Sequence, residues 1–115
     1  MSAHAPARAR WPAMAVVAAS LGFVDPAAAQ SSPAAQRGLT FVRVHCAQCH
    51  AVDAVSESPL TIAPPFRTLH RKYPIENLRG PLSQGIVVGH PTMPQFRLEP
   101  DQVGDVIAYL KTLER

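Results

Sequence analysis

The amino-acid sequence predicts an all-α fold of three to five helices. Apolar residues recur at helical spacing in three stretches, at residues 39–46, 75–86 and 103–113. Prolines separate these stretches, which indicates irregular connections. No stretch shows the alternation of apolar and polar residues that is typical of a strand, apart from an ambiguous pattern at 85–88. These observations favour helices joined by loops over a sheet.

Residues 1–29 are predicted to be a secretory signal peptide, which is removed on export. Arg8 and Arg10 precede an apolar stretch of twelve residues at 13–24, and the alanines at 27–29 offer a cleavage site. The apolar stretch is shorter than the about 20 residues of an ordinary membrane-spanning helix. An uncleaved anchor is the alternative. We expect the mature chain to be periplasmic.

The remaining 86 residues are expected to form a short flexible tail at 30–36 and one small domain at 37–115. A domain of this size has a limited core and usually needs a bound group for stability. The mature part carries nine basic and seven acidic residues without a run of lysine and arginine, so nucleic-acid binding is not expected. No later segment is apolar enough for stable membrane insertion.

The first helix is predicted to begin at Pro33, with Ser32 as its cap, and to end at about Cys49. Gly38 lies inside this helix, where glycine costs about 1 kcal/mol relative to alanine. Because glycine has no side chain, we expect this position to allow the close approach of another helix.

A proline-containing loop is expected at residues 51–65, followed by a short helix at 66–73. The next helix is predicted over residues 75–86. Gly80 and Pro81 interrupt it, and proline inside a helix removes a hydrogen bond and clashes with the preceding turn. We therefore expect a kink or two short turns at this point.

Residues 87–99 are expected to be an irregular loop. The clearest helix runs from Pro100, which suits the first helical turn, to about Leu113. Its apolar stripe consists of Val103, Val106, Ile107, Leu110 and Leu113.

The segment Cys-Ala-Gln-Cys-His at residues 46–50 is the most specific feature of the chain. This pattern is typical of the attachment site of a c-type haem. The thiols of Cys46 and Cys49 can bond to the two vinyl groups of one haem, and His50 can then offer an imidazole nitrogen to the iron. The chain contains no further cysteine. We therefore expect one covalent haem c with His50 as an iron ligand.

Two other kinds of site use paired cysteines. A structural zinc site usually needs a second Cys or His pair at short spacing, whereas only His45 and His50 lie beside these cysteines. A thioredoxin-like redox site lies in a βαβ unit, and the sequence lacks an alternating strand pattern. Haem attachment also fits the export signal, because the attachment machinery of bacteria works outside the cytoplasm.

The sixth ligand of the iron separates electron transfer from small-molecule chemistry. The candidates are Met93, His90, His70 and His45. Met93 is favoured because it is the only methionine after the signal peptide and lies among prolines, which hold a side chain at a fixed place. His90 is the main rival. His45 is expected to point away from the haem, and His70 to lie on a helix surface or near a propionate.

In their order along the chain, these features resemble the small class I c-type cytochromes of bacteria over residues 36–113. Gly38 matches the glycine of the family's N-terminal helix, and Tyr109 matches the aromatic residue of the C-terminal helix that crosses it. Ala-Pro-Pro-Phe at 63–66 resembles the family's Gly-Pro-x-Leu segment, whose proline carbonyl accepts the N–H of the ligating imidazole. The resemblance implies a cytochrome c fold packed around one covalent haem, and a role for Pro64 in orienting that imidazole.

The resemblance further implies an electron carrier, not an enzyme, in which His50 and Met93 hold the iron. Single electrons would pass between redox proteins that dock transiently on a monomer. The alternatives are a dedicated subunit of a periplasmic dehydrogenase and, with an open iron site, a haem enzyme or gas sensor. Basic residues suited to steering partners toward the haem edge are Arg43, Arg67, Arg71, Lys72 and Arg97.

Overall fold

The computed structural model describes residues 1–2, 9, 12, 31–85 and 93–115. This part consists of helices, turns and irregular segments and contains no strand, in agreement with the predicted all-α fold. None of its helices is both long enough and apolar enough to span a bilayer. Most of the expected signal peptide and residues 86–88 of the ambiguous segment lie outside the described residues.

Helix α1 spans Pro33–His45. Ser32 caps it as predicted, since the Ala35 N–H donates to Ser32 Oγ at 3.2 Å. Pro33 occupies the first position, where a missing N–H costs nothing. The helix therefore begins inside residues 30–36, and the flexible tail predicted there is wrong from Pro33 onward. The cap and the burial of Ala35 in the core order this segment.

Three short helices follow the loop at 51–65. They are the 3₁₀ helices η1, Phe66–Arg71, and η2, Ile75–Leu78, and the α-helix α2, Arg79–Gln84. The interruption expected at Gly80 and Pro81 lies one residue earlier, since η2 ends at Leu78 and α2 begins at Arg79. Pro81 is tolerated because it lies in the first turn of α2, where its missing N–H removes no hydrogen bond. Gly85 ends α2 with a φ of 99°, a conformation that favours glycine.

Helix α3 spans Pro100–Thr112, within one residue of the prediction. Glu99 and Gln102 form a capping box at its start, in which the Glu99 N–H donates to Gln102 Oε1 at 3.0 Å. All five residues of the predicted apolar stripe are buried. The helical periodicity thus correctly predicted which face of α3 enters the core.

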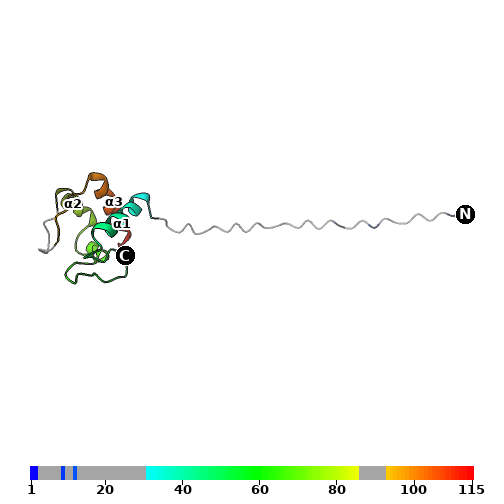
Figure 1. Ribbon diagram of the computed structural model, residues 1–115. Coiled ribbons are helices and arrows are strands. Elements are labelled where there is room, and N and C mark those ends of the chain that lie inside the picture. Colours follow the sequence, from blue (N-terminus) through cyan, green and yellow to red (C-terminus); the bar gives the residue numbers. More distant parts are fainter. Residues whose placement is uncertain (3–8, 10–11, 13–30, 86–92) are drawn as a thin grey trace.

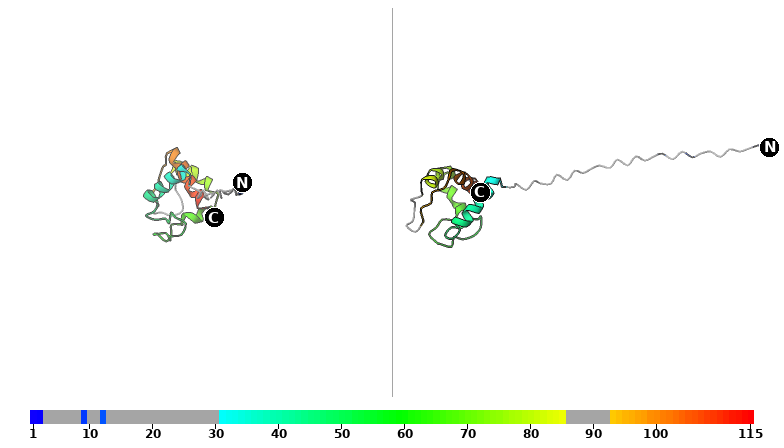
Figure 2. Two further views of the ribbon diagram at one scale, coloured as in Figure 1. Left: turned by 90° about the vertical axis from the view of Figure 1, so that its right-hand side faces the viewer. Right: turned by 45° about the horizontal axis from the view of Figure 1, so that its top comes forward.

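Helices α1 and α3 pack directly against each other, as Figures 1 and 2 show. The contact is closest at Gly38, where a Cβ atom would lie 2.0 Å from the carbonyl oxygen of Asp105. Beside it, Arg37 donates two hydrogen bonds of 2.8 Å to the Asp105 carboxylate. The close approach predicted for Gly38 is confirmed.

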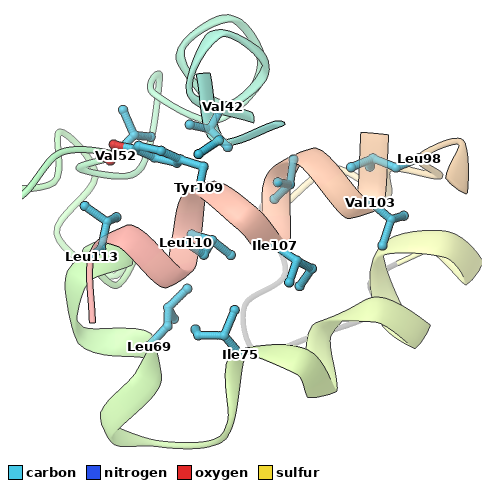
Figure 3. Packing of buried hydrophobic residues seen from close by; sticks show 12 residues of the cluster. Val42, Val52, Leu69, Ile75, Leu98, Val103, Ile107, Tyr109, Leu110 and Leu113 are labelled. Carbon is cyan, nitrogen blue, oxygen red and sulfur yellow. Dashed lines mark hydrogen bonds between the residues drawn. The ribbon is translucent and has the colours of Figure 1, made fainter. Parts of the chain in front are cut away.

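The core lies between α3 and the elements that surround it (Figure 3). Leu69 of η1 and Ile75 of η2 point toward Leu110 of α3. On another side of α3, Tyr109 reaches toward Val52 in the loop after α1. Helix α3 therefore holds α1, the loop and the 3₁₀ helices in one frame.

Candidate haem site

A cavity of about 630 Å³ opens inside this frame. Its volume lies within the roughly 300–1,000 Å³ typical of cofactor and small-molecule sites. The wall is mainly apolar and takes side chains from α1, the 51–65 loop, all three short helices, residues 93–98 and α3. Its apolar members include Phe41, Leu69, Leu82, Phe96, Val106 and Leu110. Such a wall suits a large apolar ligand.

The Cys-x-x-Cys-His segment leaves α1 through a turn. The Val42 carbonyl accepts both the Cys46 N–H at 2.8 Å and the Ala47 N–H at 3.0 Å, which interrupts the regular helical ladder. The predicted extension of the first helix to Cys49 is therefore wrong, and α1 ends at His45. The His50 N–H then donates to the Cys46 carbonyl at 3.0 Å, which closes the turn.

Cys46 and Cys49 have different places around the cavity. Cys46 lines the wall, whereas Cys49 lies in the turn and is not among the described wall residues. Burial raises the pKa of the Cys46 thiol to about 11, whereas thiol–disulfide exchange needs a thiolate. The thioredoxin-like alternative is therefore disfavoured. Within the described ranges, no group of three or more His, Cys, Asp and Glu side chains is placed to hold a metal ion.

His50 is 8% exposed and lines the cavity. Its Nδ1 lies 2.8 Å from the Pro64 carbonyl oxygen. Because a carbonyl only accepts, we assign the proton to Nδ1 and the lone pair to Nε2. The Phe66 ring lies against the imidazole with centroids 4.9 Å apart, a contact that was not predicted from the sequence. The hydrogen bond that the resemblance implied between Pro64 and His50 is present.

Met93 lines the cavity from the irregular segment that precedes α3. This segment is anchored beyond Met93, because the buried Leu98 donates its N–H to the Leu82 carbonyl at 2.9 Å. Phe96, which lies between them in sequence, also contributes to the wall. His90, the rival ligand, lies outside the described residues.

The other two histidine candidates differ in their relation to the cavity. His45 contributes to the cavity wall, although it was expected to point away, and its ring centroid lies 4.4 Å from that of Phe41. His70 lies in η1 and is not among the described wall residues. The wall therefore brings together four of the predicted site residues, which are Cys46, His50, Pro64 and Met93.

A comparison with protein-family models gave a match to the model described as Cytochrome c, over residues 35–114. Comparisons with curated proteins and with solved structures gave no match. The matched range contains the whole described cavity wall. A thiol, an imidazole and a thioether on the wall of a mainly apolar cavity fit the covalent haem of that family.

Proposed function

Because the chain belongs to the cytochrome c family, we propose that it is a small class I monohaem cytochrome that carries single electrons in the bacterial periplasm. The family binds haem c covalently and transfers electrons with it. Cys46 and Cys49 have the spacing that attachment needs. The observation that carries the proposal is the shared cavity wall of Cys46, His50 and Met93.

His50 and Met93 are the proposed axial ligands. When bound, the haem supplies a one-electron couple between Fe(III) and Fe(II). The Pro64 carbonyl accepts a hydrogen bond from His50 Nδ1, with 2.8 Å between the nitrogen and the oxygen. This hydrogen bond fixes the imidazole tautomer and increases the basicity of the imidazole. The Met93 thioether is a weak donor that favours Fe(II), so we expect a high reduction potential.

The cavity wall is expected to exclude water from the bound haem and to hold the haem ligands rigidly. Leu69, Val106 and Leu110 present apolar groups to the cavity and belong to the buried core. With two protein ligands held on this wall, a bound iron would keep the same coordination number in both oxidation states, and little rearrangement would oppose electron transfer. The two ligands would also leave no position for a substrate, which favours a carrier over an enzyme or a gas sensor.

Partner proteins are proposed to dock transiently near the mouth of the cavity. Lys72 is exposed and lines the cavity, and Arg43, Arg71 and Arg97 are also exposed. Arg67 suits steering less, because it is partly buried and donates to the Ser56 carbonyl. Steering predicts that the electron-transfer rate depends on ionic strength, and a rate independent of salt with every partner would contradict it.

Two observations test the setting of this activity. Export by residues 1–29 predicts a mature periplasmic protein that begins at about Gln30, which mass spectrometry of the secreted form would detect. A free carrier should elute as a monomer on size-exclusion chromatography. Stable co-elution with a periplasmic dehydrogenase would instead favour the dedicated-subunit alternative.

The ligand assignment is tested by optical spectra of the protein produced with the haem attachment machinery. His50/Met93 ligation predicts a low-spin c-type spectrum, the weak sulfur-to-iron band in the ferric form, and slow or no binding of carbon monoxide. Absence of the sulfur band would point to His90 or to an open site. Fast carbon monoxide binding would select the open site and thus the enzyme or sensor.

Met93→Ala should keep the covalent haem, lower the reduction potential and open the iron to added ligands, since it removes only the thioether. Gln95→Ala is the matched control, because Gln95 is exposed in the same segment. A redox titration and a carbon monoxide titration of both variants make the comparison. A Met93→Ala spectrum identical to that of the wild type would rule out this ligand.

A further inference from the structure

The backbone directly after His50 is held by three partners from three parts of the fold. The Ala51 N–H donates to Ser58 Oγ at 3.0 Å, and the Ala51 carbonyl accepts the Phe66 N–H at 2.9 Å. The Val52 carbonyl accepts the Tyr109 hydroxyl at 2.6 Å. Figure 3 shows Tyr109 directed toward Val52 from α3. Two of the three partners are side-chain hydroxyl groups.

The backbone groups in these contacts belong to buried residues. Ala51 is 3% exposed and Val52 is 7% exposed, so their polar backbone groups depend on protein partners. Burial raises the pKa of Tyr109, which therefore stays protonated and able to donate at neutral pH. Removal of either hydroxyl leaves one buried backbone group without its present partner.

The same backbone determines how His50 meets Pro64. These residues lie fourteen positions apart in sequence, yet His50 Nδ1 and the Pro64 carbonyl oxygen are 2.8 Å apart. The loop between them folds back onto its own start through the Leu60 N–H, which donates to the Cys49 carbonyl at 3.1 Å, and through the Ser58 hydroxyl. A shift of Ala51 relative to this loop would therefore lengthen the contact between His50 and Pro64.

We propose that Ser58 and Tyr109 are positioning residues for the axial imidazole. Their hydroxyl groups keep Ala51 and Val52 in register with the returning loop, and thereby preserve the hydrogen bond from His50 to Pro64. That hydrogen bond makes the imidazole a stronger donor to the iron, which favours Fe(III) and lowers the reduction potential. The inference rests on the proposed function, because it takes His50 as an iron ligand.

Ser56 offers a matched control for Ser58. Both serines belong to the same loop, but the Ser56 hydroxyl bonds to the exposed part of the loop, at Asp53 Oδ2, 2.6 Å away. Ser56→Ala therefore removes a hydroxyl without touching Ala51. Ser58→Thr keeps a hydroxyl at the position under test, and Tyr109→Phe removes only the hydroxyl and keeps the Cβ atom that lies near Gly38.

The experiment is a redox titration of four holo-variants beside the wild type, with the exchange rate of the His50 Nδ1 proton followed by NMR. The variants are Ser58→Ala, Ser58→Thr, Tyr109→Phe and Ser56→Ala. Ser58→Ala and Tyr109→Phe should raise the reduction potential and speed this proton exchange. Ser58→Thr should restore values near those of the wild type. Ser56→Ala should leave both unchanged. This pattern would support a positioning role.

Lowered thermal stability of Ser58→Ala and Tyr109→Phe with an unchanged potential and unchanged proton exchange would overturn the inference, because it would show a purely structural role. If Ser58→Ala yields no holo-protein, Tyr109→Phe decides by the same two readouts. The wild-type spectrum distinguishes a failure of the proposed function from a failure of the positioning role. A wild type without His/Met ligation would refute the proposed function, whereas normal ligation with unmoved variants would refute only the positioning role.

Discussion

Glu76 joins two elements through one carboxylate. It accepts from Arg79 of α2 and from Lys111 of α3. The hydrogen bonds from Arg79 and Lys111 lower its pKa from 4.5 to about 2. A carboxylate whose pKa is lower in the folded state stabilises the fold above its unfolded pKa, and this contribution is lost as the pH falls through its folded pKa. Glu76 should therefore act between α2 and α3 at neutral pH and cease to act in acid.

Glu76→Gln is expected to lower the melting temperature of the holo-protein slightly at neutral pH, since exposed ion pairs contribute little. The difference from the wild type should shrink as the pH falls from about 4.5 to about 2. Thermal unfolding over a pH series measures this. Glu57→Gln is the control, because Glu57 is 91% exposed and lies 3.6 Å from Arg67. A difference that stays constant with pH would exclude ionisation of Glu76 as its cause.

At the level of single residues, the sequence pointed to side chains that line the cavity but not to all the contacts that hold them. Cys46, His50 and Met93 were proposed because thiol, imidazole and thioether groups have few roles in such a pattern, and all three lie on the cavity wall. Ser58 and Tyr109 were not predicted as partners of Ala51 and Val52. Their hydroxyl groups bond to backbone atoms seven and 57 positions away, and no side-chain pattern specifies such an acceptor.

The contact between α1 and α3 depends on the missing side chain of Gly38. A Cβ atom there would lie 2.0 Å from the Asp105 carbonyl oxygen and 2.8 Å from Tyr109 Cβ. These neighbours belong to the backbone and the base of a side chain, so neither can move without moving α3. Gly38→Ala should therefore destabilise the holo-protein by about 1–3 kcal/mol or more, the typical cost of overpacking.

Gly104→Ala is the matched control within α3. A Cβ atom at Gly104 meets nothing within 4 Å, and alanine in a helix interior is favoured over glycine by about 1 kcal/mol. Urea unfolding of the two holo-variants should thus show effects of opposite sign. If the two substitutions changed the free energy of unfolding equally, or if both stabilised the protein, the close contact between α1 and α3 would be contradicted.

At the level of elements, the sequence predicted the bounds of α3 well, but neither the end of α1 nor the type of the short helix after the loop. The bounds of α3 followed from Pro100 and the apolar stripe. The end of α1 could not be predicted in the same way. The Val42 carbonyl accepts two N–H groups and the helix ends at His45, and the spacing of apolar residues does not indicate this. The pattern at 66–73 also predicted a helix but not that it would be the shorter 3₁₀ helix Phe66–Arg71.

At the level of the whole molecule, the helices and the 51–65 loop surround a mainly apolar cavity of about 630 Å³. Without a bound group its apolar wall would be exposed to water, which costs about 25 cal/mol per Å² of apolar surface. Native proteins of ordinary stability have only about 5–15 kcal/mol in total. The prediction that a bound group is needed, made from chain length alone, therefore has a physical basis in the structure.

Replacement of both attachment cysteines, as Cys46→Ala with Cys49→Ala, should yield a largely unfolded chain when the protein is purified without haem. Without haem, helix α1 and the segment from η1 to α2 would lack the contacts that the haem makes in the cavity beside Leu69 and Leu110. Far-UV circular dichroism should show much less helix than the holo-protein, and urea should produce no cooperative transition. Holo-Ser56→Ala, made in the same way but with both cysteines, controls for expression and handling. A haem-free chain with native helix content and a sharp urea transition would contradict this prediction. It would show that the helices pack around the cavity without haem, so that haem is not required for folding.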